Sequence, residues 1–149
     1  MKDSSDTRPA ANVNEESIFS LLKAAHALED KLETTLASVG LSSPKYSVLH
    51  ALVASKEPIA LGELAEKLSC VKSNATQMVD RLEADGLVRR VPDADDRRLV
   101  KAEVTPKGRE RHAEGAALIE ALEAKFTEAV EGEDRSAVGR MLRAIHSTE

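Results

Sequence analysis

Polar side chains that form hydrogen bonds gather in a short segment near the middle of the chain. This segment contains Lys72, Ser73, Asn74, Thr76 and Gln77. Glutamine and asparagine can bridge the edge of an adenine, serine and threonine contact phosphates or bases, and lysine contacts phosphate or guanine. These residue types suit the reading of a DNA duplex, although the solvated face of an ordinary amphipathic helix would have a similar composition.

A basic stretch follows this segment. Between Gly86 and Arg109 the chain has seven basic and four acidic residues, which is a local charge of +3 on a protein of net charge −5. The basic residues are Arg89, Arg90, Arg97, Arg98, Lys101, Lys107 and Arg109. A local excess of this kind is typical of a surface that contacts phosphates, whereas the negative total argues against a protein that coats nucleic acid indiscriminately.

The elements that must position these side chains are mainly helical. Apolar residues repeat at three and four positions from Ile18 to Leu36, which predicts a long first helix that ends at Gly40. Ser43 is expected to cap a second helix of about ten residues, with Pro44 at its first position. A shorter third helix follows, with apolar side chains at Leu61, Leu64, Ala65 and Leu68.

The fourth helix carries the polar segment. Ser69 is expected to cap this helix and Gly86 to end it, so that only one or two residues separate it from the third helix. Its predicted inner face consists of Val71, Ala75, Met78 and Leu82. The opposite face contains Ser73, Thr76, Gln77, Asp80 and Ala84, flanked by Lys72 and Asn74.

After Gly86 the hydrophobic period changes to two, which predicts strands at residues 87–91 and 99–104. The polar hairpin between them places Arg97 and Arg98 at its tip, where an arginine could enter a narrow minor groove. Asp96 could orient an arginine through an ion pair, which is the interpretation we favour, or could simply form the turn.

Thr105 and Pro106 open a long fifth helix, and a sixth follows near the C-terminus. The expected order is four helices, two strands and two helices. Two adjacent helices followed by a strand hairpin are the layout of a winged helix-turn-helix, so the fold class is mainly α with this motif at its centre.

The stretch LGELAEKLSCVKSNATQMVDRLEADGLVRRVPDADDRRLVKAEVTPKG, residues 61–108, resembles the MarR (multiple-antibiotic-resistance regulator) family. Four motifs match this family in order and spacing. They are the helix-turn-helix, the VDRLEADGLVRR segment that joins it to the hairpin, the DDRR sequence of the hairpin and the TPKG sequence that opens the next helix. The resemblance implies a homodimer that binds a pseudo-palindromic operator in double-stranded DNA, usually as a repressor. It also implies release by a small phenolic or aromatic acid, or by cysteine oxidation.

Residue roles follow from the same resemblance. It implies major-groove contacts by Lys72, Ser73, Asn74, Thr76 and Gln77. Arg81 would support a contact to the DNA backbone. Arg98 would enter the minor groove, with Asp96 holding it and Arg97 nearby.

The polar, aperiodic residues 1–13 are expected to form a flexible tail. Residues 14–149 are expected to form one domain, in which residues 59–104 bind DNA and the helices of 14–40 and 106–149 form the dimer. These terminal helices keep apolar surfaces that the DNA-binding part does not use, so packing between subunits is favoured over packing within one subunit.

An effector pocket is expected between the first, second and fifth helices, where aromatic and imidazole groups could receive a planar acid. The candidates are Phe19, Leu22, His26, Tyr46 and His50, with plain core packing as the alternative. Cys70 is expected at the start of the fourth helix, where a helix N-terminus favours the thiolate. It is therefore a candidate redox site, with an inert thiol as the alternative.

Several classes of function lack sequence support. The histidines at positions 26, 50, 112 and 146 lack the short spacing of a zinc site, so no metal or cofactor is expected. No phosphate loop or nucleophile elbow is present, so we expect no enzyme. Without a bilayer-spanning apolar stretch of roughly 20 residues or a signal peptide, the protein is expected in the cytoplasm, away from membranes. A competing function is a winged-helix module that binds proteins without an operator. Such a module would be expected to have an apolar or acidic outward face on the fourth helix, whereas this face is polar and the hairpin is basic.

Overall fold

The computed structural model describes residues 18–130 and 133–147, so the expected tail at residues 1–13 lies outside the described residues. The chain divides into two compact units, Met1–Lys31 and Leu32–Glu149. The elements are α1 (Ile18–Ala37), α2 (Ser43–Ser55), β1 (Ile59–Ala60), α3 (Leu61–Lys67), α4 (Lys72–Ala84), β2 (Val88–Pro92), β3 (Val100–Val104), α5 (Pro106–Ala129) and α6 (Glu133–Ser147). All six predicted helices are confirmed. None of those described has the length and apolarity that a membrane crossing requires.

The turn after α1 confirms the role expected for Gly40. This glycine has a φ of 70°, a left-handed conformation that costs a residue with a side chain more than it costs glycine. The N–H of Leu41 donates to the carbonyl oxygen of Leu36 at 3.0 Å, which closes the end of the helix. Leu36 is fully buried and anchors the C-terminal end of α1 in the core.

The cap of α2 lies one residue earlier than expected. Ser42, and not Ser43, is the N-cap, because its extended backbone directs its hydroxyl oxygen to the N–H of Lys45 at 3.4 Å. Pro44 is accordingly the second helical residue. The helix has 13 residues and ends at Ser55, and the residue that follows it, Lys56, has a left-handed φ of 61°.

The connection between α3 and α4 corrects a second expectation. Ser69 does not cap α4: its φ is 50°, and it continues the turn that ends α3. The N–H of Ser69 donates to the carbonyl of Glu66 and that of Cys70 to the carbonyl of Ala65, both at 3.0 Å. Residues 68–71 thus form a four-residue turn in place of the expected one or two, a length usual in helix-turn-helix motifs.

The inner face of α4 also differs from the prediction. Ala75, Val79 and Leu82 are buried, whereas Met78 is half-buried and Val71 is 62% exposed. Val71 is the N-cap with an extended backbone, so it lies before the helix and does not follow its periodicity. Val79 lies one helical turn after Ala75 and is buried, so it takes the position in the core that was expected for Val71.

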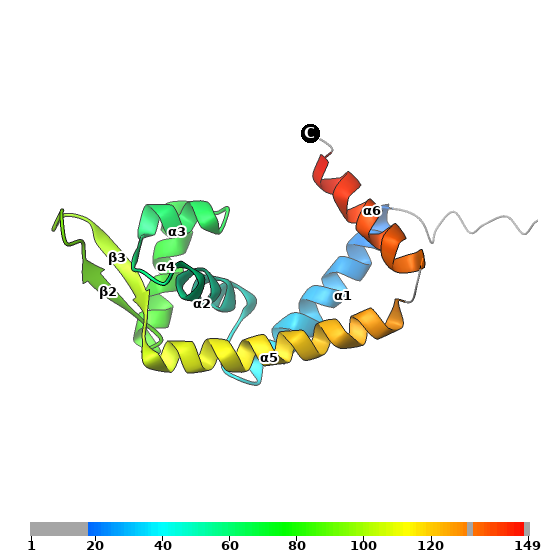
Figure 1. The fold of residues 1–149 in the computed structure, drawn as a ribbon, viewed down its shortest axis with the longest axis horizontal. Helices are drawn as coiled ribbons and strands as arrows, with labels where there is room; N and C mark the ends of the chain where they lie inside the picture. The colour runs from blue at the N-terminus through cyan, green and yellow to red at the C-terminus, as the bar shows by residue number, and fades with distance from the viewer. Residues whose placement is uncertain (1–17, 131–132, 148–149) are drawn as a thin grey trace, which may run out of the picture. The chain divides into compact units, whose positions relative to one another are not determined.

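The core lies where α2, α3 and α4 pack with a small sheet, and Figure 1 shows the β2–β3 hairpin projecting beyond these helices. The sheet has the order β1-β3-β2 and is antiparallel. The sequence missed β1, because two residues are too short to show a period. The strand β2 begins one residue later than expected, at Val88, although the N–H of Thr105 still donates to the carbonyl oxygen of Leu87 at 3.0 Å.

The structure at the start of α5 shows why threonine and glycine occur in the Thr-Pro-Lys-Gly sequence of residues 105–108. The hydroxyl of Thr105 accepts a hydrogen bond from the N–H of Gly108 at 3.0 Å and donates one to the carbonyl of Gly86 at 2.8 Å. A Cβ on Gly108 would lie 2.0 Å from the carbonyl oxygen of Leu87, so only glycine fits there. These contacts fix α5 to the base of the hairpin.

Candidate nucleic-acid interface

The outward side of α4 presents the polar residues that the sequence singled out. The side chains of Lys72, Ser73, Asn74, Gln77 and Arg81 are exposed. Thr76 is half-buried, and its hydroxyl donates to the carbonyl of Lys72 at 2.9 Å. One of its lone pairs remains available as an acceptor. The helix therefore carries a polar, solvent-facing surface about three turns long.

Ion pairs neutralise much of the basic stretch. Arg90 pairs with Asp80 and Glu83 of α4, so Asp80 is engaged within the protein. Burial alone would lower the pKa of Arg90, but its hydrogen bonds to these two carboxylates raise it overall. Arg89 pairs with Glu103 across the hairpin, and Lys101 pairs with Asp93. The local charge of +3 is consequently not spread evenly over this surface.

On α4 and at the hairpin tip, four cations have no such partner among the described residues. Among the residues that the structure describes, no ion pair or hydrogen bond engages the side chains of Lys72, Arg81, Arg97 or Arg98. Two of them lie on α4 and two at the hairpin tip. Uncommitted cations of this kind are free to contact phosphates without first breaking an internal bond.

A network of main-chain bonds shapes the hairpin tip, which we call the wing (residues 93–99). The carboxylate of Asp93 accepts the N–H groups of Asp95 at 2.8 Å and Asp96 at 3.0 Å. The pKa of Asp93 is lowered to about 2, first by the hydrogen bond from Lys101 and then by these N–H groups. The wing turn therefore keeps its charged anchor across the whole neutral pH range.

Asp96 acts on Arg98 through the main chain. Its Oδ1 accepts the N–H of Arg98 at 2.9 Å, and its carbonyl oxygen accepts the N–H of Leu99 at 2.9 Å. The ion pair to an arginine side chain that we favoured from the sequence is not formed among the described residues. Asp96 is the turn former in this structure, and the exposed guanidinium of Arg98 is left free.

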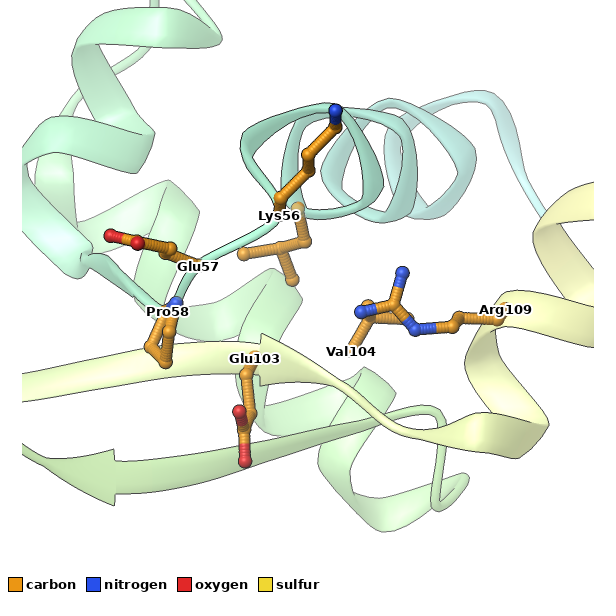
Figure 2. A pocket seen from close by; sticks show the side chains of 7 residues that line it. Lys56, Glu57, Pro58, Glu103, Val104 and Arg109 are labelled. Carbon is orange, nitrogen blue, oxygen red and sulfur yellow. The ribbon is translucent and has the colours of Figure 1, made fainter.

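A small cavity lies behind the sheet. It has a volume of about 20 Å³ and is lined by Leu52, Lys56, Glu57, Pro58, Glu103, Val104 and Arg109. Figure 2 shows Arg109 reaching toward it from the start of α5. Since a water molecule needs about 10–15 Å³ by this measure, the cavity is too small for an aromatic effector.

The expected effector residues fall into two groups. Phe19, Leu22 and His26 lie on the part of α1 that belongs to the first unit, where they line an open hollow of about 450 Å³. Phe19 is 75% and Leu22 48% exposed, so neither is plain core in this chain. The ring nitrogen Nδ1 of His26 lies 2.8 Å from the carbonyl oxygen of Leu22 on the same helix.

Tyr46 and His50 form the second group, on α2, together with a residue of α5 that the sequence did not place there. The ring of Tyr46 stacks on His112 with centroids 5.2 Å apart and on His50 at 5.8 Å. His50 Nδ1 lies 3.1 Å from His112 Nε2, and the pKa of His112 is lowered by burial and then by His50. Sixty-two positions separate the two histidines, so no local pattern could reveal their contact.

Cys70 is half-buried in the turn before α4 and is not part of that helix. Its main-chain N–H is bonded to Ala65, as described above. The described parts of the chain contain no group of three or more histidine, cysteine or acidic side chains that could hold a metal ion.

Comparison with known proteins places this geometry among transcription regulators. The model of the MarR family matches residues 41–100, from the turn before α2 to the start of β3. The HTH-type transcriptional regulator TtmR of Methylorubrum extorquens is 36% identical over 61% of this chain and 46% of its own length. The chain thus spans about half the length of such curated relatives.

Two solved structures resemble nearly the whole chain. The transcriptional regulator BldR from Sulfolobus solfataricus is 32% identical, with a TM-score of 0.68 over 85% of this chain and 91% of its own. The transcriptional repressor CouR, bound to a 23-mer DNA duplex, is 30% identical, with a TM-score of 0.76 over 86% and 90%. A further structure with the same fold, CouR from Rhodococcus jostii RHA1 bound to p-coumaroyl-CoA, is 24% identical, with a TM-score of 0.74 over 93% of this chain and 98% of its own. These relatives are regulators, in agreement with the expectation of a non-enzymatic protein.

Proposed function

Since this chain belongs to the MarR family, we propose that it is a sequence-specific transcription regulator that binds a pseudo-palindromic operator as a homodimer. The observation that carries the proposal is the distribution of cations. The basic residues of the hairpin strands are engaged in ion pairs, whereas those of the α4 surface and the wing are exposed and have no side-chain partner in the described part of the chain. A surface that binds DNA needs charge at the positions that touch the duplex.

In this proposal α4 enters the major groove. Asn74 and Gln77 are exposed on it and offer the paired donor and acceptor that an adenine edge requires. Ser73 and Thr76 add shorter contacts to phosphates or bases, and Lys72 and Arg81 contact the backbone or guanine. Arg98 enters the minor groove beside the same half-site, with Arg97 close to the phosphates. Asp96 supports both arginines by holding the turn.

The dimer is proposed to form through the terminal helices, within residues 14–40 and 106–149. The proposed domain comprises residues 14–149, and its proposed DNA-binding part is residues 59–104. The support for the dimer is a set of large apolar side chains that the terminal helices leave exposed. On α1 they are Ile18, Phe19, Leu22 and Leu28. On α5 and α6 they are Phe126, Met141, Leu142 and Ile145. Burial of such side chains against a second copy would stabilise the dimer.

We propose that the protein is a repressor and that a small phenolic or aromatic acid releases it from DNA. Tyr46, His50 and His112 support this, because their stacked rings join α2, which packs on the DNA-binding core, to α5. A planar ligand that displaces this stack would change how the two helices pack. Phe19, Leu22 and His26 are the second group of proposed ligand contacts. Oxidation of Cys70, in the turn before α4, is the other proposed route of release.

The test is a fluorescence anisotropy titration of the full chain against duplexes from its own promoter region and against scrambled duplexes. We expect the promoter site to bind at least about 10³-fold more tightly, with affinity falling steeply as salt rises. Equal affinity for both duplexes would contradict the proposal and favour the protein-interaction module. Repeating the titration with aromatic acids and with peroxide separates the two routes of release.

A further inference from the structure

An apolar side chain lies at the tip of the helix that is proposed to read DNA. Val71 precedes the first residue of α4 and is 62% exposed. The exposed residues that follow it, Lys72, Ser73 and Asn74, are all polar. The sequence predicted Val71 in the core, but Val79 is the valine buried there. Core packing therefore does not explain why residue 71 is a valine.

The position of Val71 is well fixed. Its carbonyl oxygen accepts the N–H of Asn74 at 3.0 Å and that of Ala75 at 3.3 Å, and Ala75 is fully buried. The backbone of Val71 is therefore tied to the first turn of α4, and a β-branched side chain has few rotamers. A contact made by this side chain costs little conformational entropy, in contrast to one made by a lysine or an arginine.

We infer that Val71 contacts the C5-methyl group of a thymine in each half-site of the operator. This inference rests on the proposed function. The first residues of a recognition helix are those that reach base edges, and the thymine methyl is the apolar group exposed on the floor of the major groove. Contact between the two methyl groups of valine and the thymine methyl removes apolar surface from water, which favours thymine over a base without this methyl.

The expected effect follows from the size of one methyl group. Its burial changes affinity by about fourfold in each half-site. Replacing thymine by deoxyuridine removes this methyl and leaves the Watson–Crick pairing of the base unchanged. Binding sites are first selected from a random duplex pool with the full-length chain, and each thymine is then replaced in turn.

With the wild-type protein, one thymine in each half-site should show the fourfold loss. Val71→Ala should bind the thymine duplex about fourfold less tightly per half-site and should be insensitive to deoxyuridine at that position. Val100→Ala is the matched control, because it makes the same change at an exposed valine of β3. This control should keep the wild-type deoxyuridine profile. A thermal melt of each variant checks that the exposed substitution leaves the fold intact.

The outcomes separate the inference from the function on which it rests. Selected sites at which no deoxyuridine weakens wild-type binding, or a Val71→Ala protein that keeps full sensitivity, would overturn the role of Val71 and leave the proposed function standing. A pool that yields no enriched sequence would overturn the proposed function, and the inference with it.

Discussion

The carboxylate of Asp96 accepts the main-chain N–H of Arg98 at 2.9 Å, while the side chain of this arginine has no partner among the residues that the structure describes. The bond closes the wing turn, and the loop is further tied through Asp93 to Lys101 on β3. The wing thus presents its cation from a fixed backbone, which reduces the ordering required when DNA binds.

Loss of the Asp96 bond should loosen the wing while its two arginines, Arg97 and Arg98, stay in place. We expect Asp96→Ala to weaken operator binding by about two- to fivefold, the equivalent of one hydrogen bond. Asp95→Ala is the matched control, because it removes the same charge from an exposed neighbour whose carboxylate makes none of the wing bonds. Anisotropy titrations compare the two variants, and equal effects would show that charge, and not the turn, matters.

Removal of the Arg98 side chain should affect binding more strongly. Arg98→Ala is expected to lower operator affinity by at least about tenfold, since the proposed contact of this arginine in the minor groove would be lost. Arg89→Ala, at an exposed arginine that pairs with Glu103, should change affinity far less. Both variants should remain dimers by size-exclusion chromatography with light scattering. Wild-type operator affinity in the Arg98→Ala protein would show that Arg98 does not contribute to DNA binding.

Replacement of Gly108 should lower the stability of the fold. A Cβ there would collide with the Leu87 carbonyl oxygen and lie 2.8 Å from the Val104 side chain, so Gly108→Ala should lower the free energy of unfolding by about 2–3 kcal/mol. Gly62→Ala is the control, since a Cβ at this α3 position meets nothing within 4 Å. This change should be neutral or stabilising by up to about 1 kcal/mol. Urea unfolding measures both, and similar values would contradict the close packing at Gly108.

The stability of the protein should fall in mild acid because of His112. Its pKa in the folded protein is below the ordinary value of 6.5, through burial and then His50. Well above pH 6.5 the ring is neutral in both the folded and the unfolded state and contributes nothing to the pH dependence of stability. As the pH falls below that value, the unfolded chain takes up the proton first, so the free energy of unfolding decreases. Urea unfolding between pH 5 and 8 should show a smaller decrease for His112→Gln, and an unchanged slope would contradict this role.

Binding of an aromatic acid should be visible in the fluorescence of Tyr46. The chain has one tyrosine and no tryptophan, so its emission reports on this stack alone. We expect a hydroxybenzoate to quench Tyr46 saturably over the concentrations that release operator DNA, and cyclohexanecarboxylate to do neither, because it cannot stack. Emission is corrected for absorption by the ligand. Release without a change in Tyr46 emission would place the effector elsewhere.

Local patterns predicted most of the fold. Apolar periodicity identified the helices, and Gly40 and Gly86, both with left-handed φ, marked their ends. The sequence failed where a few residues decide the outcome. The left-handed Ser69 moved the start of α4, which exchanged Val71 for Val79 in the core, and β1 exists only through its pairing with β3.

The sequence predicted which residue types form the candidate site, but not which ion-pair partners these residues have. The polar face of α4 and the arginines of the wing follow from the sequence. Which cations are free does not, because the pairs of Arg90 with Asp80 and of Arg89 with Glu103 depend on how the hairpin packs. The contact between His50 and His112 likewise depends on the packing of α5 on α2.

The most direct test of the account is methylation interference with dimethyl sulfate on a selected operator. This reagent modifies guanine N7 in the major groove and adenine N3 in the minor groove, so one experiment examines α4 and the wing together. We predict major-groove interference in two half-sites about one helical turn apart, flanked by minor-groove interference that Arg98→Ala abolishes. Interference confined to one groove, or a pattern that Arg98→Ala leaves unchanged, would contradict the proposal that α4 and the wing read DNA together.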